Sequence, residues 1–254
     1  MTSLTVAYDG AAFHGFARQP GLETVQGRLE SALSIATGRE VQITGAGRTD
    51  AGVHALGQVI SYTADPGDPD PVSLRRSVSA LAGPDIVVTG IRSARPGFSA
   101  RHDALCREYR YLLVPGPTAP LALRGRAWWT KRGLDLTAVR EGAAHLVGEH
   151  DFRSFCVRGS ADGRSTVRGI ELVDVQPALV LGEHCVVIRI VGRSFLHSMV
   201  RIMVGSLVEV GRGRRQPDWI ADALTAEHRG SAGITAPPHG LTLWHVTYPE
   251  EFWL

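Results

Sequence analysis

The alternation of apolar and polar residues divides the chain into two stretches with a loosely similar order of elements. In the first stretch, Thr24 is a typical helix N-cap and Gly38 a typical helix stop, with apolar positions at helical spacing between them. The same patterns predict strands over residues 4–8, 41–44, 58–62 and 85–91, and helices over residues 25–36 and around 74–81.

The second stretch mixes strands and helices in the same manner. Its patterns predict strands over residues 107–114, 169–175, 184–191 and 241–248, and helices over residues 136–147, 195–210 and 217–224. The helix over 195–210 would place His197 and Arg201 one turn apart. Because strict β-α-β alternation is missing, the pattern favours an α+β fold over a doubly wound sheet. We expect two domains, residues 1–102 and 103–254.

Composition narrows the class of protein only slightly. The net charge is +2, and Lys131 is the only lysine among 27 basic residues. Arginine suits phosphate oxygens and stacks on bases, but a genome that favours arginine codons gives the same bias. The composition therefore permits RNA binding without showing it.

Location and metal content follow from what the sequence lacks. The amino terminus lacks the layout of a signal peptide, and no apolar run approaches the roughly 18 residues of a membrane span. The three cysteines, an odd number, are far apart and form no CxxC pair, which disfavours disulfides and a zinc site. We expect a cytoplasmic protein without metal or membrane contact.

The stretch from Gly45 to Gly52 is the most unusual part of the sequence. A dinucleotide-binding turn has a third glycine where Asp50 stands and leads into a helix, whereas a strand is predicted here. A P-loop requires Gly-Lys-Ser or Gly-Lys-Thr, which the stretch lacks. The glycines instead allow positive φ angles and the close approach of a ligand.

Asp50 is the candidate nucleophile in this loop. The guanidinium of Arg48 favours the charged carboxylate, which is the nucleophilic form, and could equally grip a phosphate. The alternative is a Gly-Asp turn in which the carboxylate bonds to its own backbone. Spacing alone does not decide between a nucleophile and a turn.

The loop resembles the signature of the tRNA pseudouridine synthase A family. The resemblance rests on Gly45 to Ala55, read as GAGRTDAGVHA, followed by Gly57-Gln58-Val59. Further segments resemble the family in the same order along nearly the whole chain: Tyr8-Asp9-Gly10, Thr24-Val25-Gln26-Gly27, Phe98-Ser99-Ala100-Arg101, Arg107-x-Tyr109-Arg110-Tyr111, Gly148-Glu149-x-Asp151-Phe152, Phe195-Leu196-His197-x-Met199-Val200-Arg201 and Gly240-Leu241-x-Leu243.

The resemblance implies a fold and an activity. The fold would be α+β, with two similar domains sharing a continuous, mainly antiparallel sheet flanked by helices, assembled as a homodimer. The activity would be isomerisation of uridine to pseudouridine on the 3′ side of the tRNA anticodon stem-loop. The reaction breaks the C1′–N1 bond and joins C5 to C1′, so it needs no redox group or activated water. We therefore expect no cofactor.

The resemblance also implies roles for single residues. Asp50 would be the nucleophile, and Arg48 would hold the place or the phosphate of a base that has left its stack. Tyr109 would pack against the uracil and move a proton from C5, and Arg201 would pair with the catalytic carboxylate. Leu241 would line the uracil pocket. Tyr111 is expected to be structural, and His54 and His197 to lie outside catalysis.

Some positions depart from the family pattern, and other functions remain open. Phe16 stands where the family often has tryptophan, and His102 where it has an aromatic residue. These positions concern packing or RNA contacts, so they bear on substrate detail rather than on reaction type. A retaining glycosidase would need a second carboxylate about 5 Å from Asp50, for which Asp9 and Glu108 are the candidates. An inactive RNA-binding homologue, or a synthase acting on another RNA, are the further alternatives.

Overall fold

The computed structural model describes residues 1–254 apart from residues 158, 160–162 and 164. The chain forms two compact units: unit 1 comprises Met1–Arg107 with Thr242–Leu254, and unit 2 comprises Glu108–Leu241. The boundary falls inside two strands, β5 (Cys106–Val114) and β10 (Leu241–Thr247). The expected division is at residue 102. In the structure, the last residues of the chain also belong to unit 1.

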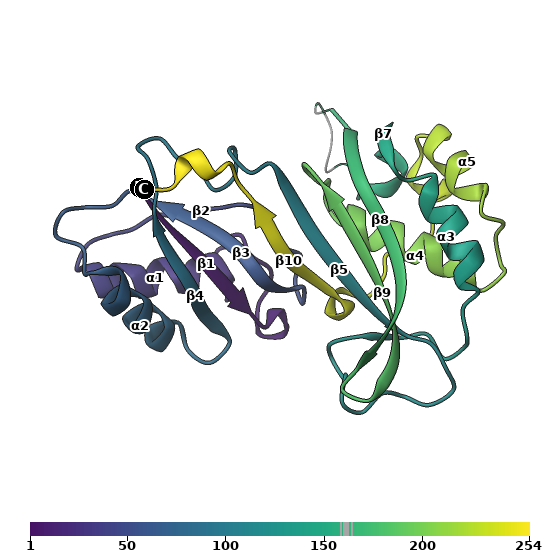
Figure 1. The fold of residues 1–254 in the computed structure, drawn as a ribbon, viewed down its shortest axis with the longest axis horizontal. Coiled ribbons are helices and arrows are strands. Elements are labelled where there is room, and N and C mark those ends of the chain that lie inside the picture. Colours follow the sequence, from purple (N-terminus) through teal and green to yellow (C-terminus); the bar gives the residue numbers. More distant parts are fainter. Residues whose placement is uncertain (158, 160–162, 164) are drawn as a thin grey trace. The chain divides into compact units, whose positions relative to one another are not determined.

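Unit 1 is a mainly antiparallel sheet with two helices (Figure 1). Its strands lie in the order β4 (Ile86–Ser93), β1 (Thr2–Tyr8), β3 (His54–Tyr62) and β10, and the two-residue strand β2 (Thr44–Gly45) pairs with β3. Strand β1 is antiparallel to both neighbours, whereas β10 is parallel to β3. Helices α1 (Val25–Thr37) and α2 (Pro71–Ala82) pack against each other, and α2 packs on β4.

Local signals explain why the first helix forms where it does. The hydroxyl of Thr24 accepts a hydrogen bond from the amide of Gly27, which satisfies one of the free donors of the first turn. Gly38 ends the helix in the left-handed region at φ 70°. Val25, Leu29 and Leu33 lie one turn apart and are almost fully buried. The predicted helix over residues 25–36 is confirmed.

The described residues of unit 2 contain further strands and three α-helices. Its strands lie in the order β5, β9 (Glu183–Gly192), β8 (Val167–Val180) and β7 (Gly148–Asp151), and β6 (Trp128–Trp129) pairs in parallel with β5. The pairs β8–β9 and β7–β8 are antiparallel. The α-helices are α3 (Leu136–Ala144), α4 (Met199–Gly211) and α5 (Trp219–Thr225). Helix α3 packs against helices α4 and α5 and against β8.

The predicted α+β class with mainly antiparallel sheets is confirmed in the described residues. No helix described here has the length and apolar character needed to cross a membrane. The three cysteines are free thiols. Five short 3-10 helices complete the described elements: Gly10–Ala12, Arg153–Phe155, Arg229–Ser231, Pro238–Gly240 and Glu250–Phe252.

The strand predicted over residues 41–44 is wrong, since only Thr44 and Gly45 form a strand. Side chains of α1 take the place of a strand partner there. The carboxylate of Glu30 accepts the amide of Ile43 at 3.1 Å, and the hydroxyl of Ser34 accepts the amide of Val41 at 3.0 Å. Val41 and Ile43 are buried although they lie outside the sheet.

The predicted start of the late helix at Phe195 is also wrong. Helix α4 begins at Met199, directly after Ser198, which lies in the left-handed region at φ 56°. A residue in that conformation interrupts right-handed helix geometry. His197 therefore precedes the helix, and it does not stand one helical turn before Arg201.

Candidate active site

The loop between β2 and β3 holds Arg48 and Asp50. Its backbone is tied to the rest of unit 1 at three points before Asp50. The amide of Ala46 bonds to the carbonyl of Val59 at 2.8 Å, and the side-chain amide of Gln58 donates to the carbonyl of Gly47 at 2.8 Å. The carbonyl of Thr49 accepts the amide of Phe16 at 3.0 Å. The loop that carries the candidate nucleophile is thus fixed by β3 and by the segment after β1.

Thr49, which lies between Arg48 and Asp50 in the sequence, turns its side chain into the core. Its hydroxyl lies 2.8 Å from the buried hydroxyl of Tyr8, and the side-chain amide of Gln58 approaches the same tyrosine at 3.5 Å. Burial raises the pKa of Tyr8 to about 12, against the hydrogen bonds from Thr49 and Gln58. Tyr8 is therefore a neutral anchor. Arg48 is exposed and Asp50 half-buried, so both lie at the surface of the loop.

Glycines shape the backbone on both sides of Asp50. The amide of Val53 bonds back to the carbonyl of Asp50 at 3.1 Å, and Gly52 closes this turn at φ 78°. Gly15, at φ 96°, lies so close that a Cβ there would stand 3.0 Å from the carbonyl oxygen of Thr49. The expectation of positive φ angles in this loop is confirmed at Gly52.

Arg107 holds the start of the loop from the far side. Its Nε and Nη2 donate to the carbonyl of Ala46 at 3.2 and 2.8 Å, and Nη2 also donates to the carbonyl of Arg101 at 2.6 Å. Nη1 donates to the carbonyl of Ala104 at 3.3 Å. Only 7% of the residue is exposed. The sequence placed Arg107 in a motif without giving it this role.

His54 supports the end of the loop. Its Nδ1 lies 3.1 Å from the amide nitrogen of Gly10 and 3.0 Å from Oδ1 of Asp9. One nitrogen cannot accept from the amide and donate to the carboxylate at once, so these two contacts belong to different states of the ring. In either state His54 joins the loop end to the turn after β1.

Strand β10 begins at Leu241, and its next residues pair with the strand that follows this loop. Thr242 is the register partner of His54, and Leu243 that of Ala55. Leu241 directly precedes Thr242 and is 5% exposed. The residue predicted to line the uracil pocket is thus one peptide bond away from a residue paired with the end of the Asp50 loop.

Tyr109 and Tyr111 lie on one face of β5 in unit 2. The ring of Tyr109 stands edge-on to Phe195, with centroids 5.1 Å apart. Tyr111 is fully buried and donates its hydroxyl hydrogen to the carbonyl of Pro237 at 2.7 Å. Burial raises the pKa of Tyr111, opposed by the charge of Arg201. Tyr111 is structural, as expected.

Arg201 lies in the first turn of α4 and is half-buried. Its Nε donates to the carbonyl of Ala236 at 2.8 Å, and the amide of Ala236 donates to the carbonyl of Arg201 at 3.1 Å. Gly205, one turn later, allows the carbonyl of Ile234 to approach so closely that a Cβ would collide with it. These contacts hold the segment before β10 against α4 and orient the guanidinium.

Glu108 does not suit the second carboxylate of a glycosidase. Arg110 Nε and Arg189 Nη2 donate to its two oxygens, each at 2.8 Å. Desolvation opposes the charged form, yet the two hydrogen bonds outweigh it and lower the pKa of Glu108. A carboxylate stabilised in this way cannot act as a proton donor near neutral pH. Asp9 accepts the amide of Ala11 at 3.0 Å and so caps the turn after β1.

The predicted site residues thus fall into two groups. Arg48 and Asp50 share one loop of unit 1, and Tyr109, Arg201 and Leu241 belong to unit 2. Within the described part of the chain, no three histidine, cysteine, aspartate or glutamate side chains gather in a way that would hold a metal ion.

Comparison with known proteins gives a consistent family. A model described as tRNA pseudouridine synthase matches residues 4–87 and 143–249. Three similar relatives are each named tRNA pseudouridine synthase A. The one from Brevibacillus brevis is 42% identical over 96% of this chain and 97% of its own. Those from Methylococcus capsulatus and Frankia casuarinae are 40% and 43% identical, over 99% and 98% of this chain and 91% and 89% of theirs.

These matches cover nearly the whole chain and agree on one class of enzyme, an isomerase that modifies RNA. The chain belongs to the tRNA pseudouridine synthase family. The predicted family and enzyme class are confirmed. The family model spans Arg48, Asp50, Arg201 and Leu241, whereas Tyr109 lies between its two matched segments. Among solved structures, a chain of a Cbf5-Nop10-Gar1 complex matches 82% of this chain and 45% of its own, at 13% identity and a TM-score of 0.35.

Proposed function

We propose that this enzyme isomerises uridine to pseudouridine in the anticodon stem-loop of tRNA, with Asp50 as the nucleophile and without a cofactor. The observation that supports Asp50 best is the anchoring of its loop. Thr49 is turned inward to Tyr8, and backbone bonds hold the residues around it, while Asp50 lies half-buried at the surface. A backbone held in this way reduces the reorganisation needed before the carboxylate attacks.

The chemistry requires one nucleophile and one proton transfer. The carboxylate of Asp50 attacks the nucleoside, on the ribose or on the uracil ring, while the C1′–N1 bond breaks and N1 keeps the electron pair. The base turns, and a bond forms between C5 and C1′ as the carboxylate leaves. C5 then loses its proton and N1 gains one. Atoms balance between substrate and product, and nothing is oxidised.

The other candidate residues would bind and orient the uridine. Arg48, exposed two residues before Asp50, would hold the phosphate or the space of the base that leaves the stack. Tyr109 would pack on the uracil and move the C5 proton, and Arg201 would supply a balancing positive charge. Leu241 would line the pocket for the base. These roles come from the family resemblance.

Replacement of the nucleophile tests the proposal directly. Asp50→Asn keeps the size and shape of the side chain but removes the nucleophilic oxygen. We expect pseudouridine formation to fall by more than about a thousandfold, with tRNA affinity within a few-fold of wild type. Release of tritium from tRNA labelled at uridine C5 measures turnover, because that hydrogen is lost in the reaction.

Asp9→Asn is the matched control, since it makes the same change in the other carboxylate near the loop. An asparagine can still accept the amide of Ala11, so activity should stay close to that of wild type. Substantial turnover by Asp50→Asn, or an equal loss in both variants, would refute the nucleophile assignment. Mapping of pseudouridine in bulk tRNA then separates the anticodon stem-loop from any other target RNA.

We further propose that the enzyme is a cytoplasmic homodimer. The three free thiols fit a reducing compartment, and tRNA modification requires access to tRNA. The dimer rests on the family resemblance alone. Light scattering on the purified protein decides it, because a single species of 27.3 kDa would contradict the dimer.

A further inference from the structure

A group of cationic and aromatic side chains in unit 2 lies outside the residues discussed so far. We call it the basic surface, and it consists of two short segments. The first, Trp128–Arg132, contributes two tryptophans, Lys131 and Arg132; the second, Arg212–Trp219, contributes three arginines and one tryptophan. No acidic residue occurs between Gly116 and Leu134 or between Val210 and Pro217.

Backbone hydrogen bonds join the two segments. Nη2 of Arg212 donates to the carbonyl of Thr130 at 3.0 Å, and the amide of Asp135 donates to the carbonyl of Gly211 at 2.8 Å. The amide of Thr130 bonds in turn to the carbonyl of Val114 in β5 at 3.1 Å. The positive charges of both segments therefore belong to one continuous part of unit 2.

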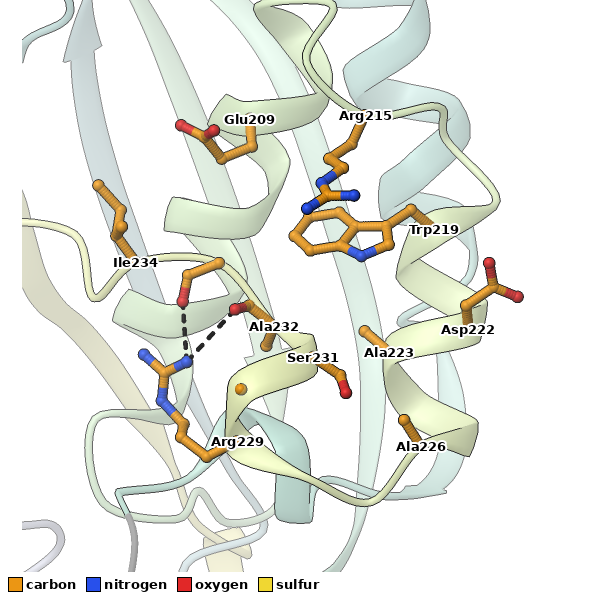
Figure 2. Close-up of a pocket in the computed structure, with 12 residues that line it drawn as sticks. Glu209, Arg215, Trp219, Asp222, Ala223, Ala226, Arg229, Ser231, Ala232 and Ile234 are labelled. Carbon is orange, nitrogen blue, oxygen red and sulfur yellow. Dashed lines mark hydrogen bonds between the residues drawn. The ribbon is translucent and has the colours of Figure 1, made fainter.

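Three of the cations are held against tryptophan rings. Lys131 Nζ lies 5.3 Å from the ring centre of Trp129, and the guanidinium carbons of Arg212 and Arg215 lie 5.8 Å and 5.0 Å from those of Trp128 and Trp219. Figure 2 shows Arg215 lying over the indole of Trp219. Such contacts restrict flexible side chains before any ligand arrives, which lowers the entropic cost of binding.

The charge of the basic surface is mostly unneutralised. Glu209 pairs with Arg214 at 3.1 Å and approaches Arg212 at 3.6 Å. The nearby carboxylates of Asp135 and Asp218 are engaged with the first turn of α3 and with His145. In the part of the chain that the structure describes, Lys131, Arg132 and Arg215 form no ion pair. A solvated protein surface ordinarily interleaves both signs of charge.

A pocket with a volume of about 610 Å³ lies beside Trp219, and its lining includes Arg215 (Figure 2). Arg229 lines the pocket and donates to the carbonyls of Ala232 and Gly233 at 3.5 and 2.9 Å. No carboxylate pairs with it among the described residues, and burial lowers its pKa. Glu209 and Asp222 add two carboxylates to the lining, so the charges of the pocket balance and the pocket is not counted as part of the basic surface.

We propose that the basic surface binds the sugar–phosphate backbone of RNA, away from the target uridine. Clustered guanidinium and ammonium groups neutralise phosphates, and the adjoining indoles offer stacking faces to unpaired bases. This inference rests on the proposed function only for the identity of the RNA, tRNA. It adds a binding surface that contributes affinity and leaves the chemistry to the Asp50 loop.

A pair of triple variants tests the inference by affinity. Lys131→Gln, Arg132→Gln and Arg215→Gln together remove three charges from the basic surface. Arg75→Gln, Arg76→Gln and Arg95→Gln, at exposed positions of unit 1, remove three charges elsewhere. Both sets are made in the Asp50→Asn background so that tRNA is bound but not converted. Affinity is measured by fluorescence anisotropy with labelled tRNA across a range of salt concentrations.

We expect the surface variant to bind tRNA about tenfold or more weakly at roughly 0.1 M salt. The slope of log affinity against log salt should fall by about 2 to 3, while the control stays close to wild type. The inference would be overturned if the Asp50→Asn parent and both triple variants bound tRNA with equal affinity, or if both triple variants lost affinity equally. A loss of binding to phosphatidylserine vesicles without any loss of binding to tRNA would also overturn it.

Chemical footprinting gives a second measurement that needs no substitution. Phenylglyoxal modifies accessible arginines, and mass spectrometry locates the adducts. Bound tRNA should protect Arg132 and Arg215 but not Arg75 or Arg76; the reverse pattern contradicts the inference. The two proposals can fail separately. If wild type converts tRNA and the surface variant binds tRNA normally, only the proposal for the basic surface is refuted. If wild type binds tRNA through the basic surface but does not convert uridine, only the proposed activity is refuted.

Discussion

The Asp50 loop of unit 1 and the basic surface of unit 2 use arginine in opposite ways. Arg107 is 7% exposed and donates hydrogen bonds to three backbone carbonyls, so its guanidinium stabilises the fold around the loop. Arg215 is exposed, touches Trp219 and forms no ion pair within the described residues, so its charge remains available to a ligand. One residue type thus provides rigidity in one region and, by our proposal, affinity in the other.

The difference teaches how the work of an RNA-modifying enzyme can be divided. A nucleophile needs fixed geometry, which buried hydrogen bonds supply because their partners have no competing water. A phosphate-binding surface needs charge that stays hydrated until the ligand displaces ions. Substitutions in the loop should therefore alter stability and turnover, whereas substitutions in the basic surface should alter affinity alone.

The largest effect on stability should come from Arg107→Leu. The change leaves the carbonyls of Ala46, Arg101 and Ala104 without their donor, at about 1 to 3 kcal/mol each where water cannot replace it. We expect the free energy of unfolding to drop by about 3 kcal/mol or more, measured by urea denaturation, with a matching loss of turnover.

Arg107→Lys is the control, because it keeps the charge but not the planar fork that reaches several carbonyls at once. Its loss should be intermediate. If Arg107→Leu unfolds within about 1 kcal/mol of wild type, the guanidinium does not organise the loop, and the contrast with Arg215 disappears.

The next effect concerns Tyr8 and alkaline pH. The folded protein holds the proton of Tyr8 up to about pH 12, whereas an unfolded tyrosine releases it near pH 10. Because the pKa of Tyr8 is raised by folding, its contribution to the free energy of unfolding is fully present below about pH 10 and is lost as the pH rises from about 10 to 12. The loss should reach up to about 3 kcal/mol, measured by urea denaturation at each pH.

Tyr8→Phe separates this contribution from that of the other buried tyrosines. The variant is less stable at neutral pH, because the hydroxyl of Thr49 loses its partner, but its stability should fall less steeply above pH 10. An identical slope in both proteins would mean that Tyr8 titrates normally in the folded state and is not the buried anchor of the loop.

The sequence predicted elements whose signals are local. The first helix follows from Thr24, Gly38 and the apolar spacing between them, all within one short segment. The strand over residues 41–44 failed because its amides bond to Glu30 and Ser34, and no pattern within the segment reports those partners. The prediction for the start of α4 failed because serine gives no indication that residue 198 adopts the left-handed conformation.

The candidate site shows the same limit. The glycines and the Asp50 motif identified the loop, because positive φ and close approach depend on residue type. The anchoring by Arg107 spans 61 positions of sequence, and the link between Tyr8 and Thr49 spans 41, so neither could be read from spacing. For the same reason, no pattern in the sequence predicts that Arg212 joins two basic segments into one surface.

The smallest effect should be that of the basic surface on folding. Lys131, Arg132 and Arg215 contribute no buried side chain and no ion pair in the described structure, so their triple replacement by glutamine removes only cation–aromatic contacts at the surface. We expect the free energy of unfolding to change by less than about 0.5 kcal/mol per substitution, while tRNA affinity falls. Urea denaturation beside the anisotropy measurement checks both. A loss of several kcal/mol would show that these cations organise unit 2 as Arg107 organises the loop, and the two regions would no longer differ in kind.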